Sequence, residues 1–338
     1  MPSSIFTGSL PFDQQTQRPY IALAPMEGLM DFNLRDVLTR VGGIDHCVTE
    51  FIRVIDLVYP SRVFRRFCPE LLNGGLTAAG TPVHVQLLGS NPEAMAANAA
   101  KAAALGAPAI DINFGCPAKT VNKSKGGAVL LQYTDQLHNI AKAVRLAVPA
   151  HIPVNAKIRL GFLDKELAID NSVALAEADI QWLCVHARTK TEGYKPPAYW
   201  EHIARIKEKI DIPVLANGEI WTAADAEQCM QESGSDLLMI GRGLVSMPDL
   251  GLQIQHHWGL REHQDLNWQQ QLDLFLSLVP KLDHLLDKQI TDRLKQWLFY
   301  FTRHFPQITE LFEQVKRERN KEDFLRVICD FKQERSDS

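Results

Sequence analysis

Cys116 is the side chain of this sequence best placed to do chemistry. It lies in the polar turn Asn113-Phe114-Gly115-Cys116-Pro117, directly after the short apolar run Ala109-Ile110-Asp111-Ile112. Such a run predicts a buried strand, and Gly and Pro end regular structure after it. A lone cysteine is more often an inert buried thiol, but three nearby lysines argue against burial here: Lys119, Lys123 and Lys125. The pattern therefore predicts a reactive cysteine where a strand ends.

The overall composition is that of an ordinary soluble globular protein. The 338 residues are 46% hydrophobic and 22% charged, and they carry a formal net charge of −4. A chain of this length forms either two domains or one large barrel with an appendage. Because the net charge is slightly negative, any basic footprint for a nucleic acid must be local.

The six cysteines predict a reduced protein without a metal site. They are scattered along the chain, with no C-x-x-C pair and no Cys/His spacing typical of zinc ligands. This distribution argues against a disulfide framework and fits a reducing cytoplasm. We therefore expect a cytoplasmic protein that binds no metal.

The first nineteen residues, 1–19, form a polar, turn-rich extension with one basic residue, Arg18. Without a basic start and an apolar stretch it is not a signal peptide, and we expect a loose N-terminal extension. No apolar run in the chain approaches the roughly eighteen residues that span a membrane. We expect no membrane partner.

Eight short apolar runs within residues 20–255 predict a barrel. They lie at 21–24, 47–49, 83–87, 109–112, 154–158, 182–186, 213–216 and 237–240, with amphipathic segments such as 92–105 and 134–147 between them. Strand and helix alternating eight times, with nearly continuous apolar strands, is typical of an α/β protein with a parallel (β/α)8 TIM barrel. A doubly wound open sheet is the alternative, but it more often has six strands and a G-x-G-x-x-G motif after the first.

Residues 256–338 predict a second, all-helical domain. Strand-like runs disappear, and helices are expected at about 268–286, 291–304, 306–318 and 321–333. Apolar residues such as Leu272, Phe275 and Leu276 recur at helical spacing and predict a bundle core. Six basic residues could share one face: Arg293, Lys295, Arg303, Lys316, Arg317 and Arg319. Such a run is usually a solvated face, and phosphate binding is the less frequent outcome.

Polar residues collect where the predicted strands end, which in a TIM barrel is the functional face. In chain order they are Pro25, Met26, Glu27 and Gly28; Glu50 and Arg53; Gln86; Asn113 and Cys116; Lys157 and Arg159; His186 and Arg188; Asn217, Gly218 and Glu219; Gly241, Arg242 and Gly243. Since the strand interiors are otherwise apolar, this convergence predicts an active site.

The last two of these loops predict a phosphate site. Both are rich in glycine, and backbone N–H groups beside Arg242 suit a phosphate monoester. Gln86, Lys157 and His186 would then face a planar cofactor, and Lys157 could stabilise a reduced flavin near its N1–C2=O edge. The alternative for Lys157 is a salt bridge with Glu27 or Glu219.

Seven motifs resemble the signatures of the tRNA-dihydrouridine synthases, from about residue 21 into the helical region. They are Ala24-Pro25-Met26-Glu27-Gly28, Val85-Gln86-Leu87-Leu88-Gly89, Asp111-Ile112-Asn113-x-Gly115-Cys116-Pro117, Lys157-x-Arg159-x-Gly161, His186-x-Arg188-Thr189, Asn217-Gly218-Glu219-Ile220 and Gly241-Arg242-Gly243. Two further stretches, 49–54 and 294–298, are similar to the C subfamily, which acts on the uridine at position 16 of the D-loop. The extension before Tyr20 and the Pro-rich stretch 193–197 depart from the family pattern.

The resemblance implies FMN as cofactor, NADPH or NADH as reductant, and tRNA as the macromolecular partner. We also expect a monomer. The resemblance places FMN on Pro25, Met26, Glu27, Gln86, Lys157, His186, Asn217, Gly218, Glu219, Gly241 and Arg242. It makes Cys116 the proton donor, and it places uridine and tRNA contacts at Arg53, Asn113, Arg159, Arg293 and Lys295.

The implied reaction sets a requirement on Cys116. A hydride from flavin N5 to C6 of uracil leaves an enolate that must be protonated at C5. A thiol with a reference pKa near 8.5 is mostly protonated at neutral pH and can act as the general acid. Inward-pointing lysines would favour the thiolate, so Lys119, Lys123 and Lys125 should face solvent or RNA phosphate.

Three other functions are weighed against this one. A flavin barrel could reduce a free pyrimidine or an enone, although the basic residues of the helical domain argue against it. A tRNA-binding barrel without catalysis would not need intact flavin and phosphate motifs. An aldolase-type barrel would use Lys157 as a Schiff-base lysine, which borohydride trapping would detect.

Overall fold

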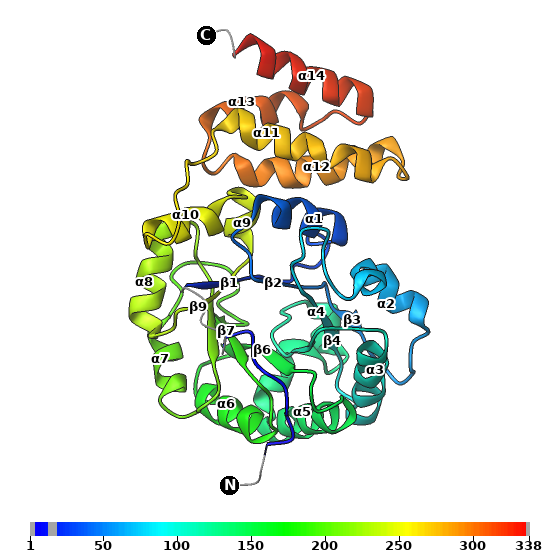
Figure 1. Cartoon of the computed structure of the whole chain (residues 1–338), viewed down its shortest axis with the longest axis vertical. Helices are drawn as coiled ribbons and strands as arrows, with labels where there is room; N and C mark the ends of the chain where they lie inside the picture. Colours follow the sequence, from blue (N-terminus) through cyan, green and yellow to red (C-terminus); the bar gives the residue numbers. More distant parts are fainter. Residues whose placement is uncertain (1–3, 13–18, 336–338) are drawn as a thin grey trace.

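A closed barrel of parallel strands carries a ring of helices, with further helices stacked at one end (Figure 1). This computed structural model describes residues 4–12 and 19–335 of the chain. The strands of the described part are β1 (Tyr20–Leu23), β2 (His46–Val48), β3 (Ile52–Arg53), β4 (Val83–Leu88), β5 (Ile110–Asn113), β6 (Val154–Gly161), β7 (Leu183–Thr189), β8 (Val214–Asn217) and β9 (Leu237–Ile240).

The barrel closes because β1 pairs with both β9 and β2, and β2 pairs with β4. All of these pairings are parallel. β2 and β3 pair with opposite ends of β4, with Cys47 opposite Val83 and Arg53 opposite Leu88. They therefore act as one barrel strand that is interrupted at residues 49–51. The predicted (β/α)8 barrel is confirmed, with its second strand split in two.

Helices surround the barrel and bury their apolar faces on the strands. They are α1 (Phe32–Val41), α2 (Ser61–Phe67), η1 (Pro69–Asn73), α3 (Pro92–Ala104), α4 (Lys119–Lys123), η2 (Gly127–Gln132), α5 (Thr134–Ala147), α6 (Ala168–Glu177), α7 (Glu201–Lys207), α8 (Ala223–Ser233), α9 (Arg242–Ser246) and α10 (Leu250–His257). Capping residues in the local sequence determine where several of these helices begin. The Asn91 side chain caps α3 ahead of Pro92, and Thr222 forms a capping box with Asp225 at α8.

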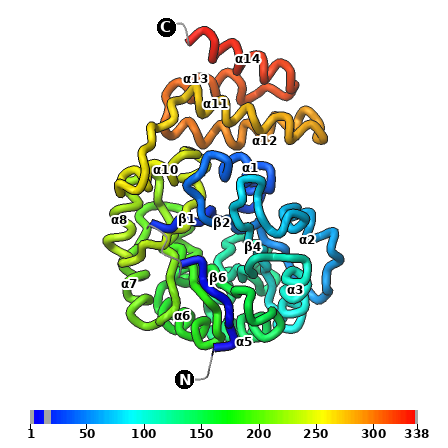
Figure 2. Tube along the Cα trace, viewed as in Figure 1, coloured from blue at the N-terminus to red at the C-terminus, as the bar shows by residue number. Residues whose placement is uncertain are grey.

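The N-terminal segment packs beneath the barrel, so the expectation of a loose extension is wrong for residues 4–12. Ile5 N donates to Asp179 Oδ2 at 2.6 Å, and Thr7 N donates to Ala150 O at 2.8 Å. The Phe12 ring lies 4.7 Å from Tyr20 and 5.2 Å from Trp182, centroid to centroid. Figure 2 shows the segment crossing the barrel. Although the segment is polar in composition, its Leu10 and Phe12 side chains pack against buried apolar residues of the barrel, and these contacts hold it in place. Residues 1–3 and 13–18 of the predicted extension 1–19 lie outside the described residues.

The C-terminal helices are α11 (Trp268–Ser277), η3 (Val279–Leu282), α12 (Asp287–Phe301), α13 (Pro306–Val315) and α14 (Lys321–Glu334). The predicted all-helical region is confirmed, but its first helix was predicted too long. It ends at Ser277 because Pro280 cannot continue an α-helix and instead opens the short 3-10 turn η3. Helix α10 also runs across the boundary predicted at residues 255–256.

The bundle contacts the barrel on the side where the active site was predicted. The Trp297 indole of α12 donates to Val245 O of α9 at 3.0 Å, and Ser246 Oγ lies 3.1 Å from His304 Nε2. In Figure 1 the bundle stands beside α1, α9 and α10, at the end opposite the N-terminus. Within the described ranges, no helix is long and apolar enough to cross a lipid bilayer.

Candidate active site

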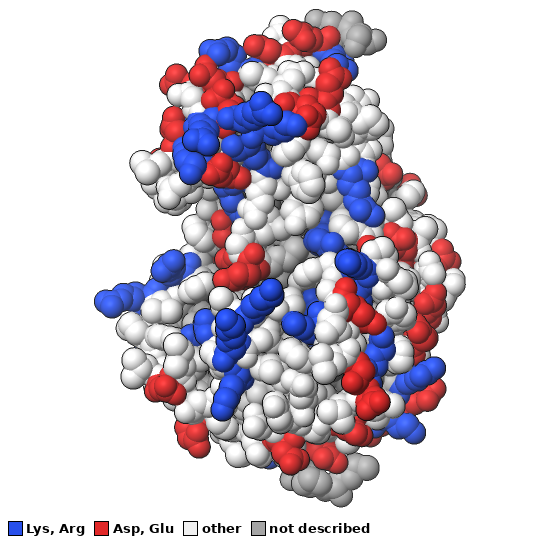
Figure 3. Space-filling view, turned by 180° about the vertical axis from the view of Figure 1, so that it is seen from behind, with Lys and Arg blue, Asp and Glu red and all other residues white. Residues whose placement is uncertain are grey.

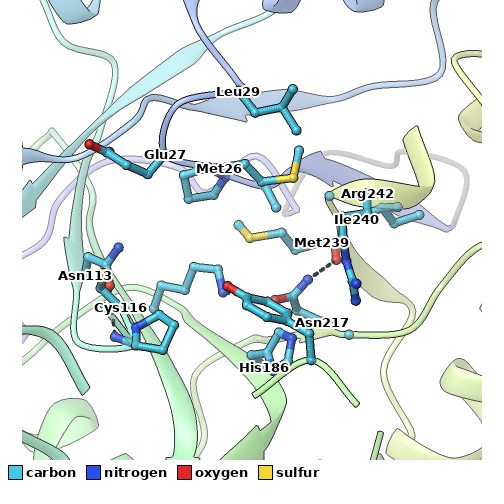
Figure 4. Close-up of a pocket in the computed structure, with 18 of the residues that line it drawn as sticks. Met26, Glu27, Leu29, Asn113, Cys116, His186, Asn217, Met239, Ile240 and Arg242 are labelled. Carbon is cyan, nitrogen blue, oxygen red and sulfur yellow. Dashed lines mark hydrogen bonds between the residues drawn. The ribbon is translucent and has the colours of Figure 1, made fainter. Parts of the chain in front are cut away.

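A cavity of about 600 Å³ opens at the carboxyl ends of the barrel strands. Its walls include all eleven predicted cofactor residues: Pro25, Met26, Glu27, Gln86, Lys157, His186, Asn217, Gly218, Glu219, Gly241 and Arg242. Cys116, Asn113 and Arg159 line it as well. Figure 4 shows Asn113 and Cys116 on one side of the cavity and Arg242 on the other. The structure thus brings together residues that are far apart in the sequence.

Cys116 is half-buried, in the turn between β5 and α4. Burial raises the pKa of its thiol, and the nearby Glu27 carboxylate raises it further. The turn is held by its backbone, because Cys116 O accepts from Ala128 N at 3.0 Å and from Asn122 Nδ2 at 3.1 Å. The thiol therefore keeps its proton at neutral pH, as the role of general acid requires.

The lysines that follow Cys116 face solvent, as predicted: Lys119, Lys123 and Lys125 are all exposed. Arg53 contacts the segment that follows the cysteine turn. Its guanidinium contacts Ser124 Oγ and donates to Thr120 O at 3.4 Å. Arg53 is therefore beside the cysteine turn but outside the residues that line the cavity.

Lys157 reaches into the cavity from β6. Its ammonium donates to Asn217 Oδ1 at 2.9 Å. Asn217 Nδ2 donates in turn to Met239 O at 2.6 Å (Figure 4). Burial lowers the pKa of Lys157. Among the described residues it forms no salt bridge with Glu27 or Glu219, so the alternative weighed from the sequence is wrong.

Amides from two neighbouring strands form one cavity wall. Asn113 Nδ2 donates to Gln86 Oε1 at 2.8 Å, and Gln86 Nε2 donates to Asp111 Oδ1 at 2.6 Å. Gly115 N donates to Asn113 Oδ1 at 2.9 Å. The amides are thus linked to each other and to the cysteine turn.

Arg159 and His186 lie side by side next to this wall. The Arg159 guanidinium donates to Gly115 O at 2.9 Å and to Gly193 O at 2.9 Å, and it lies 5.0 Å from the Tyr194 ring. Burial and the nearby arginines hold the pKa of His186 well below its usual value. His186 is therefore neutral and can donate or accept a hydrogen bond, but it adds no charge.

The loops after β8 and β9 form a charged corner around Glu219. The fully buried Arg188 forms an ion pair with Glu219, and Arg242 lies 3.7 Å from the same carboxylate. Trp221 Nε1 donates to Glu219 Oε1 at 2.8 Å. Gly218 has φ +120°, a conformation that favours glycine, so the backbone at this corner stays open. Arg242 keeps part of its surface exposed, which suits an anion.

Two carboxyl groups lie at one edge of the cavity, Glu27 from the loop after β1 and Glu50 from the break between β2 and β3. Glu50 accepts from Gly28 N at 2.5 Å, and burial raises the pKa of both Glu27 and Glu50. The charge of Glu50 also raises the pKa of Glu27, so two negative charges at this edge of the cavity are unfavourable.

Helix α12 reaches the cavity with residues other than those predicted. Gln296 and Tyr300 line it, whereas Arg293 and Lys295 do not. Arg293 forms an ion pair with Asp31 at 3.2 Å and donates to Gly28 O at 3.4 Å. Lys295 donates to Glu318 O at 2.8 Å. Both cations are therefore engaged by the protein itself.

Sequence reasoning missed several residues of the site: Asp111, Tyr194, Trp221, Gln296 and Tyr300. Asp111 carried a signal, because an acidic residue inside an apolar strand calls for a partner. Tyr194 lies in the Pro-rich stretch that departs from the family pattern. Gln296 lies in the stretch 294–298 that is similar to the C subfamily, whereas nothing in the local sequence marks Trp221 or Tyr300.

A group that could ligate a metal lies elsewhere, at the N-cap of α10 and in the loop after this helix. Asp249, His263 and Asp265 bring their ligand atoms within 4.8 Å of one another. Asp249 is already bonded, since His263 Nε2 lies 2.8 Å from its Oδ2 and Leu266 N donates to it at 2.9 Å. This network fastens the loop that joins barrel and bundle.

The cavity combines a protonated thiol, a buried cation and several N–H donors. Such a site can hold a planar ring with carbonyl edges and deliver a proton to a carbon beside it. The Gly-rich corner with Arg242 provides room and charge for a phosphate.

Comparison with known proteins gives a consistent answer. The family model described as dihydrouridine synthase (Dus) matches residues 22–334. A protein of Pseudomonas putida named tRNA-dihydrouridine(16) synthase is 54% identical over 299 residues, which cover 88% of this chain and 93% of that one. Proteins of the same name from Aquipseudomonas alcaligenes and Shewanella oneidensis are 54% and 48% identical, over 91% of this chain and 98% and 96% of theirs.

Two solved structures share the barrel. A 2-naphthoyl-CoA reductase complex matches with a TM-score of 0.53 and 14% identity, over 71% of this chain and 50% of that one. Histamine dehydrogenase from Rhizobium sp. 4-9 matches with a TM-score of 0.52 and 14% identity, over 72% and 46%. The chain spans about half the length of each, and at this identity the likeness concerns the fold alone.

Proposed function

The chain belongs to the dihydrouridine synthase family, and from that premise we propose that it reduces the C5=C6 double bond of a uridine in tRNA, at position 16 of the D-loop. The name shared by relatives that are about half identical over nearly the whole chain supports this position. One structural observation carries the proposal. A half-buried thiol whose pKa is raised faces the same cavity as Lys157 and the amides of Gln86 and Asn113.

Family membership supports a flavin cofactor, and we propose FMN. A cavity of about 600 Å³ lies within the range of roughly 300–1,000 Å³ typical of ligand sites. Lys157 and Gln86 would bind the ring, and Arg242 with the backbone of Gly218 and Gly241 would bind the phosphate. The other proposed FMN residues are Pro25, Met26, Glu27, His186, Asn217 and Glu219. Bound flavin, reduced by NADPH or NADH, would supply the hydride to C6 of uracil.

Cys116 completes the reduction by giving its proton to C5. Because its thiol is protonated at neutral pH, it can act directly as the acid. Asn113 and Arg159 would hold the base, which must leave the folded tRNA to reach the cavity. The backbone contacts of Arg159 at Gly115 and Gly193 keep its guanidinium against this wall.

The tRNA itself would lie across both parts of the molecule. Seen from behind, Lys and Arg side chains lie on the bundle and on the barrel around the hollow between them (Figure 3). Arg53 is exposed enough to meet RNA beside the cysteine turn. Arg293 and Lys295 stay predicted contacts, and a phosphate would have to compete with their present partners. We propose a monomer that works in the cytoplasm, where its proposed substrate tRNA is found.

Mass-spectrometric mapping of dihydrouridine tests the function. Unmodified bulk tRNA would be incubated with the protein, FMN and NADPH, with the Cys116→Ala variant as control. Dihydrouridine at position 16 is the expected result. Dihydrouridine elsewhere in the D-loop would keep the reaction and reject the position. None at all, from a yellow protein that oxidises NADPH, would identify a reductase of small molecules instead.

A further inference from the structure

The carboxyl group of Asp111 is buried in the barrel without a part in the chemistry described so far. Asp111 belongs to β5, is 2% exposed, and does not line the cavity. Burial raises its pKa to about 7, although the hydrogen bond from Gln86 and the charge of Lys157 both lower it. An ionisable group in such a place needs a reason, because burial of a carboxyl costs free energy.

The reason lies in a hydrogen-bond chain that starts at this carboxyl and ends at the cysteine turn. Gln86 Nε2 donates to Asp111 Oδ1 at 2.6 Å, and Asn113 Nδ2 donates to Gln86 Oε1 at 2.8 Å. Gly115 N donates to Asn113 Oδ1 at 2.9 Å. Two strands and the turn after β5 are joined in this way.

The groups at the two ends of this hydrogen-bond chain fix the direction of its hydrogen bonds. The backbone N–H of Gly115 can only donate, and the carboxyl group of Asp111 offers an accepting oxygen whether it is ionised or neutral. Each side-chain amide between them has one accepting and one donating end, so a single orientation of both amides satisfies every group. This orientation follows from the chemistry of the ends and not from the assignment of amide atoms.

We propose that Asp111 is a positioning residue for cofactor binding, because its carboxyl completes the directional chain that orients Gln86 and Asn113. The inference rests on the proposed function, since it concerns how the same cavity receives a flavin. Both amides line the cavity, whereas Asp111 stands one layer behind them.

The orientation decides what the cavity wall offers. The amide nitrogens of Gln86 and Asn113 each carry a second N–H group, which the hydrogen-bond chain does not use. Those N–H groups suit a ring edge that carries carbonyl oxygens, as a flavin or a uracil does. Without the acceptor at Asp111, the Gln86 amide would lose its anchor, and an amide turned around would set its oxygen against the carbonyl.

A different role for Asp111 is to balance the charge of Lys157. The structure favours the positioning role, because the Lys157 ammonium donates to Asn217 Oδ1 at 2.9 Å while the Asp111 carboxyl accepts from Gln86. The two roles differ in what they require. A positioning acceptor can be neutral, whereas a counter-charge cannot.

Three variants separate these roles. Asp111→Asn keeps an acceptor and removes the charge, and Asp111→Leu removes both at a similar size. Asp111→Ala removes both without adding bulk, in case leucine prevents folding, which thermal unfolding would reveal. We expect the dissociation constant for FMN, measured by quenching of flavin fluorescence, to stay within about threefold in Asp111→Asn. It should rise about tenfold in Asp111→Leu and Asp111→Ala.

A second readout uses the flavin-free protein. Hydrogen–deuterium exchange of the peptide 113–118 reports on the Gly115 amide, whose acceptor is held by the chain. This amide should exchange about tenfold faster in Asp111→Leu and Asp111→Ala and remain protected in Asp111→Asn. Asn155→Leu is the matched control, because Asn155 is opposite Asp111 on β6, fully buried and outside the cavity. It should change neither readout.

Two outcomes would overturn the proposal. If Asp111→Leu and Asp111→Ala kept wild-type FMN affinity and wild-type protection of the Gly115 amide, the hydrogen-bond chain would not be needed for FMN binding. Equal losses in Asp111→Asn and Asp111→Leu would assign Asp111 to charge balance. Failure of the wild-type protein to bind FMN would instead reject the proposed cofactor, and the exchange experiment would still decide the role of Asp111.

Discussion

The thiol of Cys116 differs from the other cysteines of the described chain in its exposure. Cys47, Cys68, Cys184 and Cys229 are buried, Cys329 is exposed on the bundle, and Cys116 is half-buried at the cavity. A half-buried thiol with a raised pKa can be reached by a substrate and still keep its proton. The same group would be a poor nucleophile, since the thiolate is the reactive form.

The variant Cys116→Ala should keep FMN and tRNA binding and lose about 100-fold or more in kcat, because general acids typically contribute that much. Single-turnover reduction of tRNA by the pre-reduced protein would measure the loss. Cys329→Ala is the matched control, since it removes an exposed thiol from the bundle. Turnover by Cys116→Ala at the wild-type rate would reject the assignment of the proton donor.

Among the elements, the strands carry a layer of buried rings under the cavity. His46 of β2 and His84 of β4 stack with centroids 4.2 Å apart, and Tyr20 Oη lies 2.9 Å from His46 Nδ1. Burial lowers the pKa of His84 to about 3 and holds the pKa of His46 well below its usual value. The barrel therefore folds around neutral histidines.

Stability should fall when the protein is acidified below the unfolded histidine pKa of about 6.5. The folded pKa of His84 is depressed, so its contribution is present above that value and is lost as the unfolded chain takes up protons. Between pH 7 and 5, His84 should contribute a loss of about 2 kcal/mol. Urea unfolding at several pH values would measure it.

The variant His84→Phe isolates this effect, because it keeps an aromatic ring and cannot be protonated. Its free energy of unfolding should depend less on pH than that of the wild type. His151→Phe changes an exposed histidine and should leave the dependence as it is. Equal pH dependence in wild type and His84→Phe would show that His84 is not kept neutral by burial.

Helix α12 fastens the bundle to the barrel mouth. The Arg293 guanidinium bonds to main-chain oxygens of Gly28 and Leu29 and pairs with Asp31, all in the segment between β1 and α1. Gln296 also donates to Gly28 O, at 3.0 Å. The helix thereby shapes the loop whose residues Met26 and Glu27 line the cavity.

The variant Arg293→Gln should lower the free energy of unfolding by about 1–3 kcal/mol, since it removes charge-assisted hydrogen bonds that are largely buried. Arg326→Gln is the control, because Arg326 is 66% exposed and pairs with Asp323 of its own helix. The salt dependence of tRNA binding gives the second readout. A slope that is smaller by about one in Arg293→Gln would add a phosphate contact to its structural role.

In the molecule as a whole, different parts of the chain contact the two ends of the barrel. Helix α12 of the bundle lines the rim of the cavity at the carboxyl ends of the strands, and residues 4–12 lie against the amino ends. Function and stability are thereby separated, because the cavity lies at one end and the Phe12 contact at the other. Changes beneath the barrel should leave the active site intact.

The variant Phe12→Ala should lower the free energy of unfolding by about 2 kcal/mol, less than the roughly 3–5 kcal/mol of a fully buried Phe, because Phe12 is half-buried. FMN affinity should not change. Phe32→Ala is the control, since the side chain of Phe32 is 37% exposed. Unchanged stability in Phe12→Ala would show that the N-terminal segment is not part of the folded core.

The sequence by itself determined the barrel, the helical bundle and most of the cavity. Apolar runs at regular intervals specify strands and helices through contacts between near neighbours, and parallel strands place their carboxyl ends at one face. The residues that follow the strands therefore had to meet, whatever the details of packing. Cys116, Lys157 and Gln86 were predictable for this reason.

Only the tertiary structure decided which of these residues bond to one another. The link from Asp111 to Gln86 depends on the stagger of β4 and β5, and the engagement of Arg293 depends on how α12 sits on the loop after β1. The docking of Phe12 depends on a surface made by Tyr20 of β1 and Trp182, directly before β7. Such contacts join residues that are distant in the chain, and their free energies come from packing and from satisfying buried polar groups, which no local pattern encodes.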